Sequence, residues 1–241
     1  NISNLIRNIL TLRYDPLQKT TLPILKPNDF KPLKNYDLNY IENNLKNSIE
    51  TTLNSTKNLT ISLSGGIDST LVLALIRKSF PDLKINVISI KFFNSVDETI
   101  TAKKISENFE TEHEIIDVEN YLLDLPAAIE IIGIPFWDIH WYYIAKNAKS
   151  KSNFLASGDG GDELFGGYTF RYSKFLSLIK PNSSPLDKIQ AYLSCHERDW
   201  VPDQEKIFNQ KTNFSWKSIN SIFKPFFDNS LSSLNQVFLA D

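Results

Sequence analysis

The stretch S-G-G-I-D-S at residues 64–69 follows a short apolar run at 59–63 and opens into the apolar, helix-compatible segment 70–76. Two adjacent glycines let the backbone approach a ligand closely. The hydroxyls of Ser64 and Ser69 and the unpaired N–H groups of a helix start can then donate hydrogen bonds to an anion. The stretch therefore predicts a nucleotide phosphate site between a strand and a helix, with a turn that merely requires small residues as the alternative interpretation.

Asp68 lies within this turn, where its negative charge is unsuited to direct contact with an anion. A carboxylate beside phosphates normally needs a cation between them, so Mg²⁺ is expected together with the nucleotide. The turn lacks the lysine and the spacing of the G-x-x-x-x-G-K-[ST] phosphate loop. An ordinary kinase or GTPase site is therefore not indicated.

A second glycine cluster, S-G-D-G-G-D-E-L-F-G-G-Y at residues 157–168, follows the apolar segment 154–156. It holds five of the chain's eight glycines, two more lie at 65–66, and Gly133 is the eighth. Its acidic residues Asp159, Asp162 and Glu163 follow a predicted strand end, which is where open α/β sheets place their ligands. The two clusters together favour a ligand site over a solvated acidic loop.

The string S-G-G-x-D-S resembles the signature of the pyrophosphatase-loop ATP enzymes, which cleave ATP between the α and β phosphates. With the second cluster in this order and at this distance, residues 59–172 resemble the synthetase domain of the asparagine synthetase family. The resemblance implies that ATP activates a carboxylate, with aspartate as the first candidate, as an acyl-adenylate. Pyrophosphate is released, and a nitrogen nucleophile then attacks to give an amide.

The resemblance also implies roles for individual residues. The pyrophosphate loop would comprise Ser64, Gly65, Gly66, Asp68 and Ser69. Asp68 and Asp162 resemble the family's metal pair and, with Asp159, are the catalytic candidates. Asp159 stands where asparagine-forming members often carry glutamate. The expected adenylate contacts are Leu63 and Ile90, through their backbone, with Ser157 and Gly158.

Hydrophobic periodicity predicts alternating strands and helices. Strands are expected at 59–63, 85–92, 113–118 and 153–156, and helices at 39–53, 69–80, 97–109, 121–132 and 137–148. This alternation predicts an α/β fold with a parallel sheet and helices on both faces. With the resemblance, we expect a doubly wound, five-stranded sheet of the adenine nucleotide α-hydrolase type. The expected division is an N-terminal arm at 1–35, the synthetase domain at 36–180 and a truncated helical extension at 181–241.

The composition, with 41% hydrophobic and 22% charged residues, is that of an ordinary globular protein. A net charge of −2 without a long basic run gives no support for a nucleic-acid or membrane-surface partner. No apolar stretch approaches transmembrane length, and the start does not resemble a signal peptide. The single cysteine, Cys195, is expected to be a packed helix residue, and the default location is the cytoplasm.

The source of nitrogen stays open at this point. No glutaminase region or initial cysteine precedes the synthetase region, so ammonia, a separate glutaminase or an amine co-substrate is expected. The chain starts at Asn1 and contains no methionine, which suggests a trimmed chain. The family's late lysine is not found, and its loss would slow turnover. Alternatives to asparagine formation are a related ligase with another acceptor, as in β-lactam formation, and a non-catalytic ATP-binding module. The amphipathic segment 231–239 could pack within the chain or against a partner, such as a second copy in a homodimer.

Two further groups of residues are weaker candidates for contact with the substrate. Asp97 and Glu98 open a predicted helix, so capping and the helix dipole are preferred to substrate contact as their role. The aromatic-rich segment 137–143 could form a wall of the acceptor pocket, with Asp138 as its best candidate. Core packing is preferred for Trp141 and Tyr142.

Overall fold

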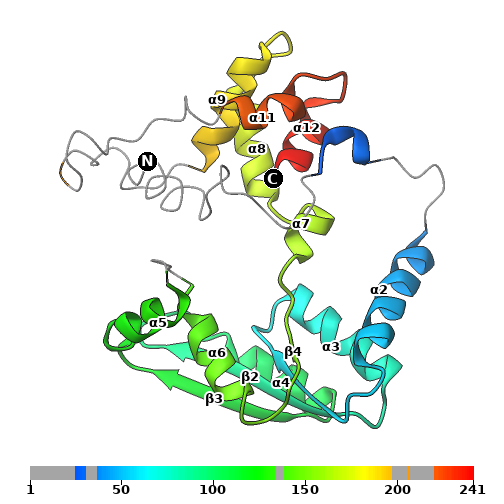
Figure 1. Ribbon diagram of the computed structural model, residues 1–241, viewed down its shortest axis with the longest axis vertical. Helices are drawn as coiled ribbons and strands as arrows, with labels where there is room; N and C mark the ends of the chain where they lie inside the picture. The colour runs from blue at the N-terminus through cyan, green and yellow to red at the C-terminus, as the bar shows by residue number, and fades with distance from the viewer. Residues whose placement is uncertain (1–24, 31–36, 134–137, 197–205, 207–219) are drawn as a thin grey trace. The chain divides into compact units, whose positions relative to one another are not determined.

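The computed structural model describes residues 25–30, 37–133, 138–196, 206 and 220–241 (Figure 1). The chain divides into two compact units, one formed by Leu33–Asp162 and the other by Asn1–Pro32 together with Glu163–Asp241. Each unit is described by itself. The division of the chain predicted from sequence, at residues 35 and 180, stays a prediction.

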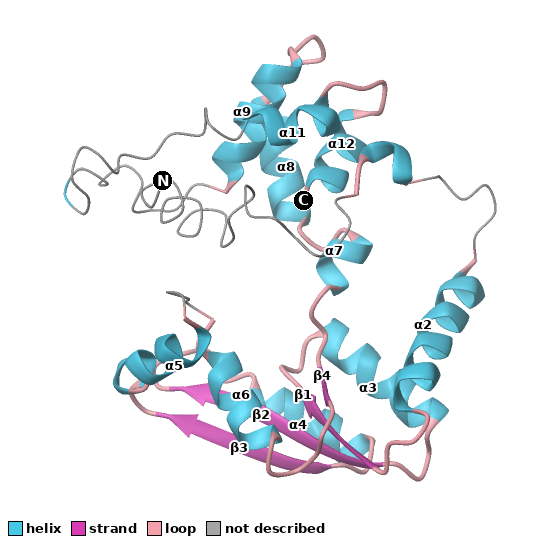
Figure 2. Ribbon diagram, viewed as in Figure 1, coloured by secondary structure: helices cyan, strands magenta, loops and turns pink. Residues whose placement is uncertain are grey.

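The first unit contains a sheet of four parallel strands in the order β3-β2-β1-β4 (Figure 2). The strands are β1 (Asn58–Ser62), β2 (Lys84–Phe92), β3 (Glu112–Val118) and β4 (Leu155–Ala156). From β1 the sheet grows outward through β2 to β3, and the chain then returns to place β4 on the other side of β1. The predicted parallel, doubly wound arrangement is confirmed, with its switch point between β1 and β4.

The expected number of five strands is wrong for the described residues, which form four. The physical reason is that the sequence contains only four strand-like segments. After β4 the chain passes directly into α7 (Gly161–Phe165) and α8 (Thr169–Leu178). No extended segment therefore follows β4 in the described part to pair with either edge of the sheet.

The helices of the first unit agree with the predicted positions, with shifts at their ends. They are α2 (Leu38–Leu53), α3 (Ile67–Ser79), α4 (Thr99–Asn108), α5 (Leu125–Ile132), preceded by the short η2 (Tyr121–Leu123), and α6 (His140–Ala148). Asp37 caps α2 by accepting a hydrogen bond from the Tyr40 N–H at 2.7 Å. Gly133, with φ of 78°, ends α5 in the left-handed conformation that favours glycine. Trp137, at the predicted start of α6, lies outside the described residues.

Helices cover both faces of the sheet, as alternate residues of β2 show. Ile85 and Val87 pack in one buried cluster with side chains of α3 and α4. Ile88 and Ile90 point to the opposite face, where they pack against Ile144 of α6. Because both faces are covered, β2 is buried over most of its length, as is usual for a parallel strand.

The second unit is helical in its described part. Besides η1 (Pro27–Asp29) and α8, it contains α9 (Pro185–Cys195), α11 (Asn220–Phe227) and α12 (Ser233–Ala240). Its core includes Tyr172, Phe175, Phe227 and Val237. Val237 lies on α12, so the apolar face of this helix packs within the chain. Of the two possibilities for the amphipathic segment 231–239, the structure shows packing within the chain.

Two further findings concern the described residues as a whole. Cys195 is half-buried at the end of α9, and burial raises the pKa of its thiol, in agreement with the expected packed residue. None of the described helices combines the length and apolar character needed to cross a membrane.

The core of the first unit makes a testable prediction in α3, where Leu73 is fully buried and Leu71 is 43% exposed. Leu73→Ala should lower the free energy of unfolding by about 2–5 kcal/mol, because it removes buried methyl groups and leaves a cavity. Leu71→Ala, the matched control in the same helix, should cost less than about 1 kcal/mol. Urea unfolding measures both values, and equal losses would contradict the packing described above.

Candidate functional site

The two glycine clusters meet at the switch point of the sheet. Strand β4 pairs in parallel with β1, with Thr60 opposite Leu155 and Ile61 opposite Ala156. The turn after β1 and the loop after β4 therefore leave the sheet side by side at its carboxyl edge. This is the arrangement in which open α/β sheets form a ligand site.

The loop after β4 passes directly against the first turn of α3. A Cβ atom at Gly158 would lie 2.5 Å from the Ser69 nitrogen and 2.9 Å from the Asp68 Cβ. A Cβ atom at Gly161 would lie 2.6 Å from the Asp68 Cγ. Only glycine fits at these positions without displacing the neighbouring backbone or carboxylate. The close approach joins the two clusters into one candidate site.

The turn at residues 64–69 leaves several donors for a ligand. Gly65 has φ of 85°, and Gly66 is the N-cap of α3. The first helical hydrogen bond runs from the Thr70 N–H to the Gly66 carbonyl, at 3.2 Å. The N–H groups of residues 67–69 thus precede the helical hydrogen-bond ladder and are oriented for an anion. The hydroxyls of Ser64 and Ser69 lie 3.2 Å apart beside them.

Asp68 and Asp162 are both partly exposed in this region. Within the described residues, neither carboxylate forms a hydrogen bond or an ion pair, so their oxygens are available as ligands. Carboxylate oxygens are the donor type that Mg²⁺ prefers, and Mg²⁺ usually completes its shell with waters and phosphate oxygens. The residues present therefore fit such an ion. In the described part of the chain, no group of three or more His, Cys, Asp or Glu side chains could hold a metal alone.

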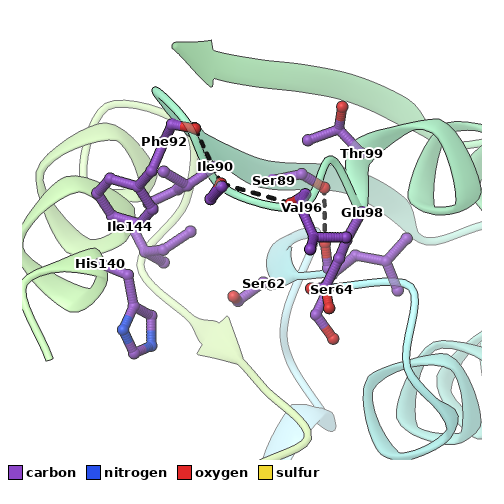
Figure 3. Close-up of a pocket in the computed structure, with 12 residues that line it drawn as sticks. Ser62, Ser64, Ser89, Ile90, Phe92, Val96, Glu98, Thr99, His140 and Ile144 are labelled. Carbon is purple, nitrogen blue, oxygen red and sulfur yellow. Dashed lines mark hydrogen bonds between the residues drawn. The ribbon is translucent and has the colours of Figure 1, made fainter. Parts of the chain in front are cut away.

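A pocket of about 400 Å³ lies beside the turn (Figure 3). Its lining residues come from the ends of β1 and β2, the loop that follows β2, and the starts of α4 and α6: Ser62, Leu63, Ser64, Ser89, Ile90, Phe92, Ser95, Val96, Glu98, Thr99, His140 and Ile144. Three predicted contacts, Leu63, Ser64 and Ile90, line this pocket. Ser157, Gly158 and Asp159 do not, although the Gly158 backbone touches the same turn.

The backbone of Leu63 is already engaged in a network that spans three strands. Its N–H donates to the Ile88 carbonyl at 3.0 Å, and its carbonyl accepts from the Ser89 hydroxyl at 2.6 Å. The Ser89 oxygen also lies 2.9 Å from Nε2 of His113 on β3. A ligand that bonds to the Leu63 backbone would therefore use the second lone pair of the carbonyl. Sequence reasoning missed Ser89 and His113, although each is a polar residue within a predicted strand.

The structure divides the roles of Asp97 and Glu98. Asp97 accepts hydrogen bonds from the N–H and the hydroxyl of Thr99, at 3.1 and 2.5 Å, and pairs with Lys91 at 2.7 Å. These partners, the Lys91 hydrogen bond first, lower the pKa of Asp97. Glu98 makes no capping bond and lines the pocket instead. Side-chain capping is therefore confirmed for Asp97 and wrong for Glu98, although as the N-cap residue of α4 Glu98 still places its charge at the positive end of the helix dipole.

The segment before β4 contributes to the pocket through His140. Asp138, its predicted candidate, does not line the pocket. Trp141 and Tyr142 pack against buried clusters on the α6 face of the sheet, as expected for core residues. The sequence signal for His140 was the aromatic-rich segment itself, although periodicity could not show which of its members faces the pocket.

These features define an α/β protein with a candidate ligand site between two paired loops at the switch point of a parallel sheet. The chain belongs to the asparagine synthase family, whose profile matches residues 40–223. Among curated proteins, asparagine synthetase (glutamine-hydrolysing) 1 of Bacillus subtilis is 37% identical over 126 residues, covering 48% of this chain and 19% of that protein. A protein assigned the same type of activity in Methanocaldococcus jannaschii is 36% identical over 118 residues, covering 44% and 22%.

The matched part of this chain thus spans about a fifth of the length of these relatives. Among solved structures, an NH3-dependent NAD synthetase from Campylobacter jejuni shares 15% identity with a TM-score of 0.42. That comparison covers 82% of this chain and 99% of the other.

The His113 network predicts a pH dependence of stability. Burial, followed by the positive charge of Lys103, lowers the pKa of His113 in the folded protein. The unfolded chain then binds a proton at the ordinary pKa, near ~6.5, before the folded chain does. The contribution is present above that value and is lost as pH falls through it toward the folded pKa. Chemical unfolding from pH 7.5 to 5 should show this loss.

Two variants test the assignment. His113→Gln cannot titrate, so its stability should fall less between pH 7.5 and 5 than that of the parent protein. Lys103→Gln removes only the secondary cause of the shift and should give an intermediate slope. A steeper acid loss in His113→Gln would contradict the role assigned to His113.

Proposed function

We propose that this chain carries the ATP-activating part of an amide-forming ligase of the asparagine synthetase type. The observation that supports this most strongly is the fit of Gly158 and Gly161 against Asp68, which unites the two family motifs in one site. In the proposed reaction a carboxylate oxygen, first that of aspartate, attacks the α-phosphorus of ATP and pyrophosphate leaves. A nitrogen nucleophile then attacks the acyl carbon, and AMP leaves as the amide forms.

The turn at 64–69 would hold the β and γ phosphates, because the N–H groups of residues 67–69 precede the helical hydrogen-bond ladder and two serine hydroxyls lie beside them. Asp68 and Asp162 would hold Mg²⁺. When bound there, the ion offsets phosphate charge and stabilises the leaving pyrophosphate. With the phosphates held at one end, the α-phosphorus is positioned for attack by an incoming carboxylate.

The adenylate would contact the Leu63 carbonyl and Ile90 at the strand ends, and Ser157 and Gly158 in the loop after β4. Asp159 is the proposed catalytic carboxylate of that loop. Its backbone N–H is held by the Ser157 hydroxyl at 3.3 Å, and its side chain is exposed. A carboxylate in this position would accept a proton from the attacking nitrogen.

The nitrogen donor is proposed to be ammonia, either free or delivered by a glutaminase. Both curated relatives described above are named glutamine-hydrolysing, and this chain matches only about a fifth of each. A cytoplasmic location and a homodimer belong to the same proposal. Neither changes the chemistry assigned to the site residues.

The proposed reaction predicts pyrophosphate release from MgATP that depends on aspartate and ammonia. Asp68→Asn and Asp162→Asn should each reduce the release rate about 100-fold or more, because each removes an oxygen ligand that offsets developing charge. Asp82→Asn, at an exposed turn before β2, is the matched control and should leave the rate unchanged. A coupled pyrophosphate assay with each amino acid in turn measures these rates.

The outcomes separate the alternatives. Release that requires a carboxylate other than aspartate would replace the acceptor while keeping the adenylating chemistry. ATP binding without release under any condition would refute the ligase activity in favour of a non-catalytic module. Full activity in both aspartate variants would show that the paired loops do not hold the metal.

The close approach of the two loops makes a separate prediction. Gly161→Ala would place a Cβ atom against the Asp68 carboxylate, at a cost of about 1–3 kcal/mol for the displacement. The Kd for MgATP should rise about 5- to 150-fold, as calorimetry would show. Gly133→Ala is the control, because it introduces strain at a φ of 78° with nothing within 4 Å. It should lower stability and leave the Kd unchanged. Unaltered binding in Gly161→Ala would contradict the role of the contact.

A further inference from the structure

The pocket beside the turn differs in character from the turn itself. Its walls are mixed: the apolar side chains of Leu63, Ile90, Phe92, Val96 and Ile144 share the lining with serines, Thr99, His140 and Glu98. No lysine or arginine is among its lining residues in the described part of the chain. A volume of about 400 Å³ is in the usual range for small-molecule sites. Such a pocket suits a flat, neutral group with a few polar atoms rather than an anion.

Glu98 is the one carboxylate in the pocket lining, and its side chain has no partner within the described residues. Its neighbour Asp97 already binds Lys91 and Thr99, so that cation is not available to Glu98. Figure 3 shows Glu98 and His140 on opposite sides of the pocket. Glu98 is therefore an unused hydrogen-bond acceptor in a pocket of mixed polar and apolar lining.

The sign of the charge limits what Glu98 can bind. A carboxylate without a cation repels phosphate, and the donors suited to phosphate lie instead in the turn at 64–69. Neutral hydroxyl groups are good donors to a carboxylate, and their hydrogen bonds to a charged acceptor are the stronger kind. In open α/β sheets, an acidic residue after the second strand can bind a ribose hydroxyl. Glu98 also lies after β2, in the connection to α4 and farther along the chain from the glycine turn.

We propose that Glu98 accepts a hydrogen bond from a ribose hydroxyl of the bound nucleotide and makes this site selective for ribonucleotides over 2′-deoxyribonucleotides. This inference rests on the proposed ATP site and assigns its sugar specificity. The phosphates lie at the turn, the base lies against the apolar side chains of the lining, and the ribose presents its hydroxyls to Glu98. Glu98 is a binding residue and takes no part in proton transfer.

Calorimetric binding of ATP, 2′-deoxyATP and ITP, each with Mg²⁺ and without any acceptor carboxylate, tests the proposal. The parent protein should bind ATP about tenfold or more tightly than 2′-deoxyATP, as expected for a lost hydrogen bond to a charged group. In Glu98→Ala the two nucleotides should bind within about twofold of each other. Glu98→Gln keeps a neutral acceptor and should give an intermediate ratio.

Matched controls keep the result specific. Glu107→Gln, on the exposed side of α4, should retain the parent ratio of ATP to 2′-deoxyATP. The ratio of ATP to ITP reports on the base and should be the same in the parent and in Glu98→Ala. Thermal unfolding of Glu98→Ala should match the parent, because the side chain has no partner within the described residues.

Three results would overturn the proposal while leaving the ATP site in place. The first is a parent ratio near one, and the second is an unchanged ratio of ATP to 2′-deoxyATP in Glu98→Ala. The third is loss of the ATP-to-ITP ratio instead, which would assign Glu98 to the base. Binding of neither nucleotide by the parent would refute this proposal together with the ATP site. Selective binding without pyrophosphate release would refute the ligase activity alone and leave the assignment of Glu98 in place.

Discussion

The candidate site depends on the close packing of a glycine backbone against the first turn of α3. Gly158 and Gly161 lie so close to Ser69 and Asp68 that a Cβ atom at either glycine would overlap with these residues. Pairing of β4 with β1 brings the two loops to the same edge of the sheet, and the missing side chains let them touch. The first turn of α3, with the Asp68 carboxylate, then lies against the second loop one residue before Asp162. A larger residue at either glycine would separate the groups that the site must combine.

Much of the fold was predictable because its signals are local. The strands are short segments rich in isoleucine, valine and leucine, and amphipathic helices repeat at their own period, so the predicted alternation was correct. Helix ends were less accurate, because a cap is set by backbone geometry: Gly66 adopts an extended conformation and α3 begins at Ile67. The short β4 reflects its position at the sheet edge, where it pairs only with β1. The length of β4 could not be predicted from its own residues, because strand pairing depends on segments that are distant in the sequence.

The candidate site was predictable where glycine patterns mark its loops. It was not predictable where the direction of a side chain decides which residues line the pocket. Asp97 and Glu98 are adjacent acidic residues before one helix, and sequence treats them alike. Successive residues at a helix start point in directions about 100° apart, so one carboxylate reaches Thr99 and the other the pocket. The hydrogen bond from Ser89 to the Leu63 carbonyl, and the one between Ser89 and His113, likewise join residues that are far apart in the sequence. No local pattern encodes such a contact.

The distribution of charge across the site constrains the kind of ligand it can hold. Unpaired amides and two serine hydroxyls at the turn favour a strongly anionic group. Beside the turn, a pocket of mixed lining, without lysine or arginine and with one unpaired carboxylate among its described residues, favours a neutral group that carries hydroxyls. A free pyrophosphate would leave the pocket empty, and a nucleoside alone would leave the turn without an acceptor. A nucleoside phosphate satisfies both regions at once, and an ion held by Asp68 and Asp162 would relieve the repulsion between its phosphates and the carboxylates.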